Sequence, residues 1–433
     1  MKNQKYFILF LVVIVLIVFT SMASAKQVIS VMRVGVLDAG PGYLEPFKEY
    51  YEKKHPDVEI KIVNSDWGSY HERIPVWVRA GKEPDVYLTS VMEYGMLQRL
   101  GAILPLDDVI DEELKSTMPK RFLDWFSVDG SLYGVPGQVG AYIFWYNKDI
   151  FKEAGLDPAK PPTNWQELKE YAVKIKENTD AYPIGLNLGR PADATQLILG
   201  NIYYSATNEP FVDGEGKARF NSPNGIAAIK YMLELVEEGL TQPNPEQTTK
   251  GDTRILFKDG KVAMYYDTCS SKKYWVELTD LTSAETSKFA TASPIKSSFE
   301  DKKAMVTTNA DPWVVSANSK YPEIAKDVLR ELLKPEWTHA HNIATSSTPF
   351  RTDVMDQFDY DYEWMLEQNH EDLMESFSQT LQTPPGLEDI PIKTIYTEAL
   401  QKVVLGMLSV EEALNGAAQE IEKVLKEADE FYK

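Results

Sequence analysis

Residues 130–168 read GSLYGVPGQVGAYIFWYNKDIFKEAGLDPAKPPTNWQEL, and this stretch decides the fold. The run from Ala141 to Tyr146 is apolar, aromatic and short, which is typical of a buried strand. Asn147 stands where it can cap a short helix, and Gly155 is the residue type that most often ends a helix in a left-handed conformation. The pattern therefore predicts a buried strand followed by a well-delimited helix.

A second helix is predicted after Pro162. Thr163 and Gln166 have the spacing of a capping box, in which each side chain satisfies the other residue's unpaired backbone N–H. The helix that begins there carries apolar residues on one face: Trp165, Leu168, Ala172 and Ile175. One strand therefore joins two regions through a stiff connection.

The beginning of the chain predicts export. Lys2 and Lys5 precede an apolar run over residues 6–19, and Ala23-Ser24-Ala25 fits the small-residue cleavage pattern. These features predict a cleavable signal peptide, residues 1–25, with Lys26 as the first mature residue. An uncleaved membrane anchor is the alternative. The apolar run is marginal for a span of about 20 residues, and the cleavage site argues against an anchor. No cysteine follows the run, so the sequence predicts a soluble periplasmic or extracytoplasmic protein and not a lipoprotein.

Composition narrows the classes of partner. The 433-residue chain has a formal net charge of −20, which becomes −22 without Lys2 and Lys5 (−20 − 2 = −22). Such an acidic chain repels nucleic acid, so no nucleic-acid partner is predicted, and the protein is expected to be a soluble monomer. Cys269 is the single cysteine, which excludes an internal disulfide. The length favours two domains.

Strand and helix patterns alternate in the mature chain. Residues 31–37 predict a buried strand, and a helix with Leu44, Phe47 and Tyr51 on one face follows. Residues 58–62 alternate between apolar and charged, which predicts a strand at a sheet edge, and 84–88 predict another strand after a further helix. This order predicts an α/β fold with a mostly parallel sheet.

Several motifs together resemble a known family. They are YNKDIFKEAGL at 146–156, PTNWQEL at 162–168, GSLYGVP at 130–136, FKDGKVAM at 257–264 and SVEEAL at 409–414. In this order they resemble the family 1 extracellular solute-binding proteins, the sugar-binding receptors of bacterial ABC importers. The resemblance, to maltodextrin-binding-like members, implies a carbohydrate ligand, permease subunits as partners and no cofactor.

The resemblance also implies an architecture, the two-lobed periplasmic-binding-protein fold with a hinge and an interlobe ligand cleft. Carried over by position, residues 26–141 plus 305–345 form the N-terminal lobe, and 146–300 plus 350–433 form the C-terminal lobe. The interlobe crossings are then 142–145, 301–304 and 346–349. Ligands of open α/β sheets bind beyond the carboxyl ends of the strands, so these ends are expected to line the cleft.

Enzyme and metal motifs are absent from the sequence. It has no HExxH, GxSxG, Walker A or CxxC pattern. His339 and His341, two of only five histidines, are two residues apart and point to different faces of a helix, so no metal site is predicted. No catalytic residue is predicted, although an exported carbohydrate-active enzyme stays an alternative because carboxylates are plentiful. A structural surface protein would need an anchor or repeats, and neither is visible in the sequence. Within the class of binding proteins, peptides or polyamines are weaker candidates for the ligand.

Aromatic content is the positive indication. The chain has nine tryptophans and 23 tyrosines, several beside carboxylates. Because a ring covers the apolar face of a sugar while carboxylates bond its hydroxyls, three pairs are favoured as ligand contacts. These pairs are Asp66 with Trp67, Asp311 with Trp313, and Asp267 with Tyr266.

The resemblance extends this set. It implies contacts from the loop after the first strand, from the segments at 66–70 and 89–90, from the residue after the GVPG turn, and from the C-terminal lobe. The predicted ligand-binding residues are Asp38, Tyr43, Asp66, Trp67, Tyr70, Ser90, Gln138, Tyr204, Asp267, Asp311, Trp313 and Arg351. If Arg190 or Arg351 faces the cleft, an acidic sugar is the expected ligand, because a guanidinium binds a carboxylate through two hydrogen bonds.

Overall fold

The computed structural model describes residues 26–34, 42–65, 67–189, 201–268, 271, 287–305, 307–345, 347, 349–358 and 389–432. The strands are β1 (Gln27–Val34), β2 (Val58–Ser65), β3 (Val86–Leu88), β4 (Ser127–Val128), β5 (Ser131–Leu132), β6 (Val135–Asn147), β7 (Tyr182–Gly185), β8 (Val262–Thr268), β9 (Phe289–Ala292) and β10 (Thr307–Val315). The helices are α2 (Leu44–Lys54), α3 (Trp67–Arg79), α4 (Val91–Arg99), α5 (Glu112–Ser116), α6 (Lys120–Trp125), α7 (Lys148–Glu153), α8 (Trp165–Asn178), α10 (Pro223–Glu237), α11 (Lys250–Lys258), α13 (Pro322–Leu332), α14 (Pro335–Thr345), α15 (Thr352–Gln357), α18 (Asp389–Val404) and α19 (Val410–Tyr432).

One eight-stranded sheet runs through the molecule. Its order is β2-β1-β3-β10-β6-β8-β7, and β9 also pairs with β6. β1 pairs in parallel with β2 and β3, and β7 in parallel with β8, whereas β6 and β10 pair antiparallel with each other. β2 lies at an edge, as its alternation of buried and exposed residues predicts.

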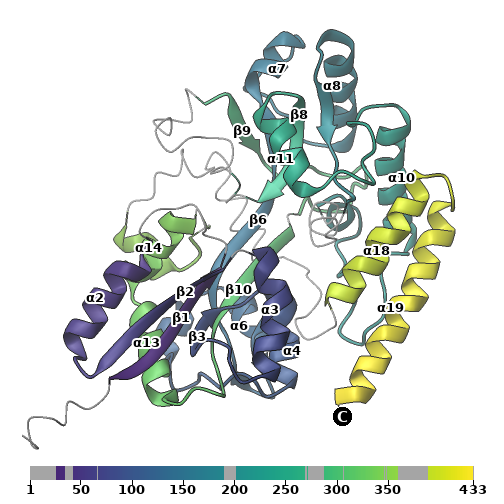
Figure 1. Ribbon diagram of the computed structural model, residues 1–433. Helices are drawn as coiled ribbons and strands as arrows, with labels where there is room; N and C mark the ends of the chain where they lie inside the picture. Colours follow the sequence, from purple (N-terminus) through teal and green to yellow (C-terminus); the bar gives the residue numbers. More distant parts are fainter. Residues whose placement is uncertain are drawn as a thin grey trace, which may run out of the picture.

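β6 joins two halves of the molecule. Its 13 residues pair with β10 over Val135–Tyr142 and with β8 and β9 over Tyr142–Asn147. Figure 1 shows β6 passing from the group of β1–β3 to the group of β8 and α8. We call the elements from β1 to β5 with α13, α14 and α15 the N-lobe, and those from α7 to β9 with α18 and α19 the C-lobe. The predicted strand at 141–146 covered only the C-lobe half of β6.

Local signals around β6 are mostly confirmed. The Asn147 Oδ1 atom accepts hydrogen bonds from the backbone N–H groups of Asp149 at 3.0 Å and Ile150 at 3.3 Å, and Gly155 has φ 72°. The capping-box prediction for α8 was wrong by one residue. Asn164 is the N-cap, and Thr163 donates to Glu167 Oε2 from its N–H at 2.8 Å and its hydroxyl at 2.7 Å.

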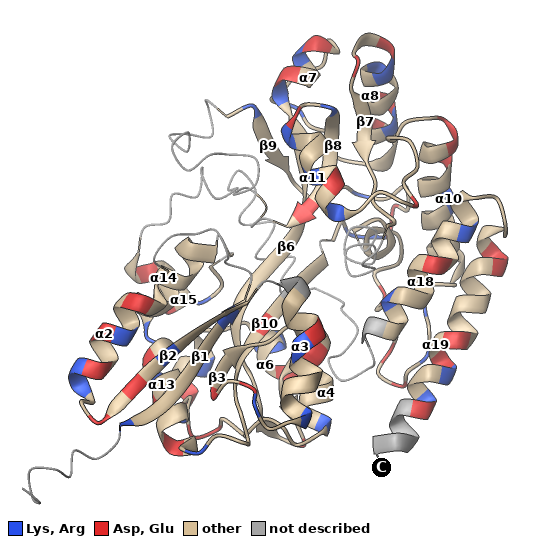
Figure 2. Cartoon of the chain, in the orientation of Figure 1, with Lys and Arg blue, Asp and Glu red and all other residues tan. Residues whose placement is uncertain are grey.

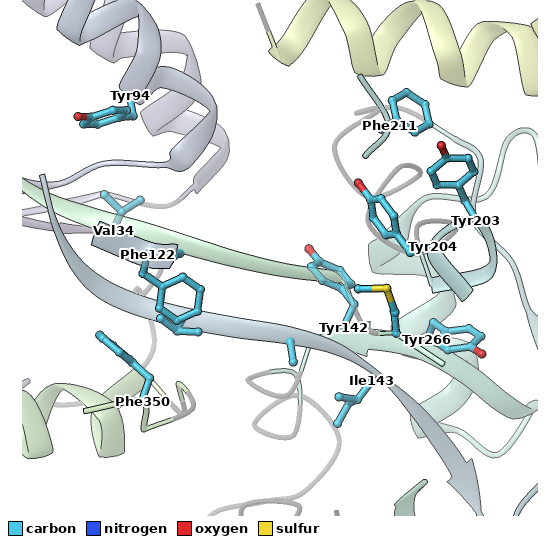
Figure 3. Close-up of a cluster of buried hydrophobic side chains, with 14 of the residues drawn as sticks. Val34, Tyr94, Phe122, Tyr142, Ile143, Tyr203, Tyr204, Phe211, Tyr266 and Phe350 are labelled. Atoms are coloured by element: carbon cyan, nitrogen blue, oxygen red, sulfur yellow. The ribbon is translucent and has the colours of Figure 1, made fainter. Parts of the chain in front are cut away.

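Buried side chains of both lobes flank the central strands. Figure 3 shows Phe122 and Phe350 on the N-lobe side and Tyr203, Tyr204 and Phe211 on the C-lobe side of the crossing. The predicted apolar face of α8 is buried as expected. Figure 2 shows Lys, Arg, Asp and Glu interspersed along the helices, whereas the strands are mostly uncharged. No helix in the described ranges is long and apolar enough to cross a membrane.

The segment 349–358 packs on the N-lobe. The backbone N–H of Thr352 donates to Thr117 O at 3.0 Å, and the Phe350 ring lies 5.8 Å from Phe122. The expected division placed residues from 350 onward in the C-lobe, whereas these contacts join the segment 349–358 to N-lobe elements. Burial of Phe350 and Arg351 against N-lobe elements is the physical reason. The lobe boundaries stay predictions.

Candidate functional site

The carboxyl ends of the parallel strands β1, β2 and β3 lie at one edge of the N-lobe sheet. Thr89 and Ser90 follow β3, and β10 runs beside them, since the N–H of Thr89 donates to Pro312 O at 2.9 Å. This edge is where an open α/β sheet binds its ligands. Polar side chains gather at this edge.

A cluster of acidic side chains lies at this edge. Asp311, on β10, is 3% exposed, and its Oδ1 atom accepts a hydrogen bond from Val91 N–H at 3.1 Å. Glu93, on α4, is 2% exposed, and its Oε1 atom lies 2.7 Å from Nδ1 of His71 on α3. The Glu93 Oε2 atom is buried without a partner among the described residues. Two carboxyl groups are thus held out of water.

The electrostatics of Asp311 follow from its surroundings. Burial raises its pKa to about 7, the Val91 hydrogen bond opposes the rise, and the Glu93 charge adds to it. The charges of His71 and of Lys393, on α18 of the C-lobe, also lower its pKa. Asp311 is therefore a carboxyl group that carries a proton part of the time near neutral pH and is influenced by both lobes.

A bulge directs side chains at this edge. The register between β10 and β6 shifts at Asp311 and Pro312, so that Asp311 lies opposite Gln138 and Pro312 opposite Pro136. Gly137 is thereby left without a partner, as in a β-bulge. The Gln138 side chain is half-buried, and its Oε1 atom has no hydrogen-bond partner in the described ranges.

We expect Gly137→Ala to lower the free energy of unfolding by about 1–3 kcal/mol. A Cβ atom there would lie 2.5 Å from Trp313 Cδ1 and 2.7 Å from Leu88 Cδ1, and both of these side chains are buried. Urea denaturation measures the loss. Gly214→Ala is the control, because a Cβ atom there meets nothing within 4 Å. Equal stability of the two variants would show that the bulge tolerates a side chain.

Two predicted aromatic residues meet at a buried histidine. The Tyr43 hydroxyl lies 2.9 Å from Nδ1 of His341, and the Trp313 ring centroid lies 6.0 Å from that of His341. Burial, with a smaller effect of the Arg33 charge, lowers the pKa of His341 to about 3, so this imidazole is neutral. Tyr43 and Trp313 are 6% and 4% exposed, so their rings pack in the interior beside the strand ends.

Tyr70 and Ser90 hold local structure. The Tyr70 hydroxyl shares a hydrogen bond with Thr89, and the Ser90 Oγ atom accepts from Met92 N–H at 3.2 Å as the N-cap of α4. These bonds position the turn after β3. Both residues lie beside the acidic cluster in sequence and in space, since α4 carries Glu93.

In the C-lobe, Asp267 has cationic partners. It is fully buried and accepts two hydrogen bonds from Arg254, at 2.7 and 3.0 Å, while Lys250 Nζ lies 3.8 Å away. Burial alone would raise the pKa of Asp267, but the Arg254 and Lys250 charges lower it below its usual value. Lys250 Nζ also donates to the Tyr142 hydroxyl at 3.2 Å, which links this network to the crossing strand β6.

The two predicted tyrosines of the C-lobe lie in the apolar interior. Tyr204 is 2% exposed and its ring lies 5.2 Å from that of Tyr203, and Figure 3 shows both beside Phe211. Tyr266 is 6% exposed, with its ring 5.1 Å from that of Phe144.

Arg351 joins helices of the N-lobe. It is 1% exposed, donates to both carboxylate oxygens of Asp353, and donates from Nη1 to Leu333 O at 2.6 Å and Thr338 Oγ1 at 3.0 Å. Its donors are used inside the lobe, so we leave Arg351 out of the proposed site.

The remaining predicted residues lie outside what the structure describes. Asp38, Asp66 and Arg190 fall outside the described residues, as does the side chain of Trp67. Their predicted roles stay predictions. Within the described ranges, no group of three or more His, Cys, Asp or Glu side chains is arranged to hold a metal ion.

Sequence reasoning missed Glu93 of the acidic cluster and the two basic residues that act on Asp311, His71 and Lys393. They belong to α3, α4 and α18, and no local motif relates them. The usable signal was the position of Glu93 just after the predicted strand end at Leu88.

A cavity of about 470 Å³ on the C-lobe, lined by Tyr182, Gln242, Ile255 and neighbouring residues, contains none of the predicted ligand residues.

Comparison with known proteins agrees with this architecture. A binding protein of Brucella abortus is 28% identical over 252 residues, which cover 58% of this chain and 59% of that protein. The arabinooligosaccharide-binding protein of Bacillus subtilis is 26% identical, over 47% of this chain and 46% of that protein. The match thus spans less than two thirds of the length of these relatives.

A solved structure shows the same fold over nearly the whole chain. The cyclic alpha-maltosyl-1,6-maltose binding protein of Arthrobacter globiformis superimposes with a TM-score of 0.76 at 21% identity, covering 93% of this chain and 100% of that one. Its fold is a two-lobed α/β fold, as expected from the sequence. The sequence model of the family of bacterial extracellular solute-binding proteins matches residues 35–339 of this chain. Since this match covers most of the chain, the protein belongs to the family of bacterial extracellular solute-binding proteins.

Proposed function

We propose that this protein captures a carbohydrate, a mono- or oligosaccharide, between its two lobes and delivers it to the permease subunits of an ABC importer. One observation carries the proposal. Glu93, on the helix that follows β3, and Asp311, on β10, place buried carboxyl groups at the edge that α18 of the C-lobe approaches. Carboxylates accept hydrogen bonds from sugar hydroxyls, and few convergent polar groups in an apolar wall are typical of small-molecule sites.

Capture follows from closure of the lobes. A ligand that contacts both lobes only when they are closed shifts the population toward the closed form. β6 and β10 cross side by side between the lobes, so a small rotation about these two strands changes the separation of the strand ends. The closed form is the one that the permease recognises in this mechanism.

The export, the monomeric state and the absence of turnover are proposed from the sequence. The protein is exported through its signal peptide, is not lipid-anchored, acts as a monomer without a cofactor, and binds its ligand without turnover. The similarity to an arabinooligosaccharide-binding protein and to a maltosyl-maltose binding protein supports a sugar ligand. An acidic sugar or another polar solute is the second candidate, favoured by the ammonium group of Lys250, which lies 3.8 Å from Asp267 in the C-lobe.

A thermal-shift panel of neutral and acidic saccharides tests the function. A ligand at 100 times its Kd adds about 2.7 kcal/mol to the free energy of unfolding, which raises the Tm by several degrees. We expect such a rise with at least one sugar, and unchanged sugar by mass spectrometry afterwards. No rise with any saccharide would contradict a carbohydrate ligand, and released products would favour the enzyme alternative.

A pair of glutamine variants tests the place of binding. Gln138→Ala removes a half-buried amide beside Asp311, so we expect sugar affinity to fall about tenfold, the worth of one hydrogen bond. Gln166→Ala is the control, since Gln166 is exposed on α8 and bonds Glu170. Titration calorimetry measures both. Equal affinities would place the ligand away from the β6–β10 bulge.

A further inference from the structure

The beginning of α18 reaches across from the C-lobe to the N-lobe. α18 packs on α10 and α19 of its own lobe and also contacts α4, the helix that carries Glu93. Lys393, in the first turns of α18, is 5% exposed. A lysine is rarely buried to this degree without an anionic partner, because removing an ammonium group from water is costly.

The Lys393 charge acts on a carboxyl group outside the C-lobe. The Lys393 charge lowers the pKa of Asp311 on β10, as does the charge of His71 on α3, whereas the Glu93 charge on α4 raises it. Asp311 and Glu93 are nearly fully buried, and Glu93 keeps one carboxylate oxygen without a partner in the described part of the chain. The cluster thus holds two carboxyl groups on the N-lobe side and an ammonium group on the C-lobe side.

We propose that Lys393 is the counter-charge that allows the lobes to close over Glu93 and Asp311, and that this balance makes the site selective for uncharged sugars. The proposal rests on capture by closure, as stated above. Closure without Lys393 would bury these carboxyl groups without the ammonium group that acts on Asp311, and a buried charge that has lost its partner is strongly unfavourable. Lys393 is a positioning residue in this scheme, because it acts on the ligand through the closure of the lobes.

The selectivity follows from the same charges. A neutral sugar offers hydroxyl groups to the unpartnered Glu93 oxygen and leaves the charge balance unchanged. An acidic sugar would bring a further negative charge beside two carboxyl groups, and like charges in a low-dielectric site repel strongly. Arg254 of the C-lobe does not offset this repulsion, because it is already bonded to Asp267 through two hydrogen bonds.

The lobe separation is measured first without any sugar. Nitroxides at exposed positions of the two lobes, introduced as Lys61→Cys and Glu177→Cys in a Cys269→Ser chain, report the distance by double electron–electron resonance. We expect a short-distance population in the parent protein, its loss in Lys393→Met, and its retention in Lys393→Arg. Lys402→Met, an exposed position on the same helix, is the control and should match the parent.

A double variant separates charge balance from simple packing. Lys393→Met with Glu93→Gln removes one charge of each sign, so we expect the short-distance population to return. If Lys393→Met keeps the parent distances, or if the parent has no short-distance population, the proposal is overturned. A failure of the double variant to recover closure would likewise show that Lys393 acts by shape and not by charge.

Sugar binding then provides the second readout. Apparent affinity falls by the factor by which the binding-competent population falls, so a tenfold loss of closed protein gives about a tenfold weaker Kd in Lys393→Met. A loss of affinity with unchanged distances would mean that Lys393 contacts the sugar directly, which also overturns the closure role. If no sugar binds the parent protein, the carbohydrate function fails, while the sugar-free distances still decide the role of Lys393.

Discussion

Replacing Arg254 by methionine is expected to lower the free energy of unfolding by about 3–5 kcal/mol. Asp267 is fully buried and receives two hydrogen bonds from the Arg254 guanidinium group. Without Arg254 its charge is left with Lys250, whose Nζ atom is 3.8 Å away. Because the pKa of Asp267 is lowered in the folded protein, its favourable contribution is present above its unfolded pKa and is lost as the pH falls through the folded value.

Urea denaturation at neutral pH measures this loss, and two variants interpret it. Arg219→Met breaks an ion pair with Asp213 in which the arginine side chain is 46% exposed, so its cost should stay below about 1 kcal/mol. Arg254→Met with Asp267→Asn removes both charges and should recover part of the stability. Equal, small losses at Arg254 and Arg219 would show that Asp267 is not held by its buried pair.

Replacing Asp311 by asparagine is expected to raise the free energy of unfolding at pH 8 by roughly 2–4 kcal/mol. Burial raises the pKa of Asp311 to about 7 from 3.8, so between these values the folded protein binds a proton that the unfolded chain has released. Stability therefore falls as the pH rises through this window, and the full cost is present above pH 7. Asparagine keeps an oxygen that accepts the Val91 N–H and has no charge to bury.

The pH dependence distinguishes this effect from a general change in packing. Urea denaturation should give equal stabilities for Asp311→Asn and the parent near pH 4, where both side chains are uncharged. The difference should grow up to pH 7 and stay constant above it. A variant less stable than the parent at pH 8 would show that the Asp311 carboxylate is well compensated. Sugar affinity, measured in parallel, is expected to fall because a hydrogen-bond acceptor of the site has been changed.

The periodicity of apolar residues and the residues that begin and end helices predicted most of the fold. The apolar run after Ala141, the cap at Asn147 and the left-handed Gly155 depend on interactions within a few residues, so they were recognisable without tertiary contacts. The predicted strand was too short because glycine and proline near Gly137 obscured its N-lobe half. That half is a strand because β10 pairs with it, which is a contact distant in sequence.

The candidate site was predicted only in outline. Strand ends and loop aromatics pointed to Asp311 and Trp313, which lie on β10 beside the carboxyl end of β3, and their role in binding stays a prediction. Arg351 shows the limit of this reasoning, because an arginine beside a proline-led loop could bind a ligand or a backbone carbonyl. Its environment decided in favour of Asp353 and Leu333.

The sequence by itself predicted export of the protein, and it determined the alternation of strands and helices, the family and the residue types that suit a sugar. The tertiary structure alone decided which charges meet. His71 and Glu93 come from two N-lobe helices, Asp311 comes from the crossing strand β10, and Lys393 comes from the C-lobe, so nothing in their local sequence relates them. The physical reason is that burial and pairing of charge depend on distances between elements, whereas strands, helices and caps depend on neighbours along the chain.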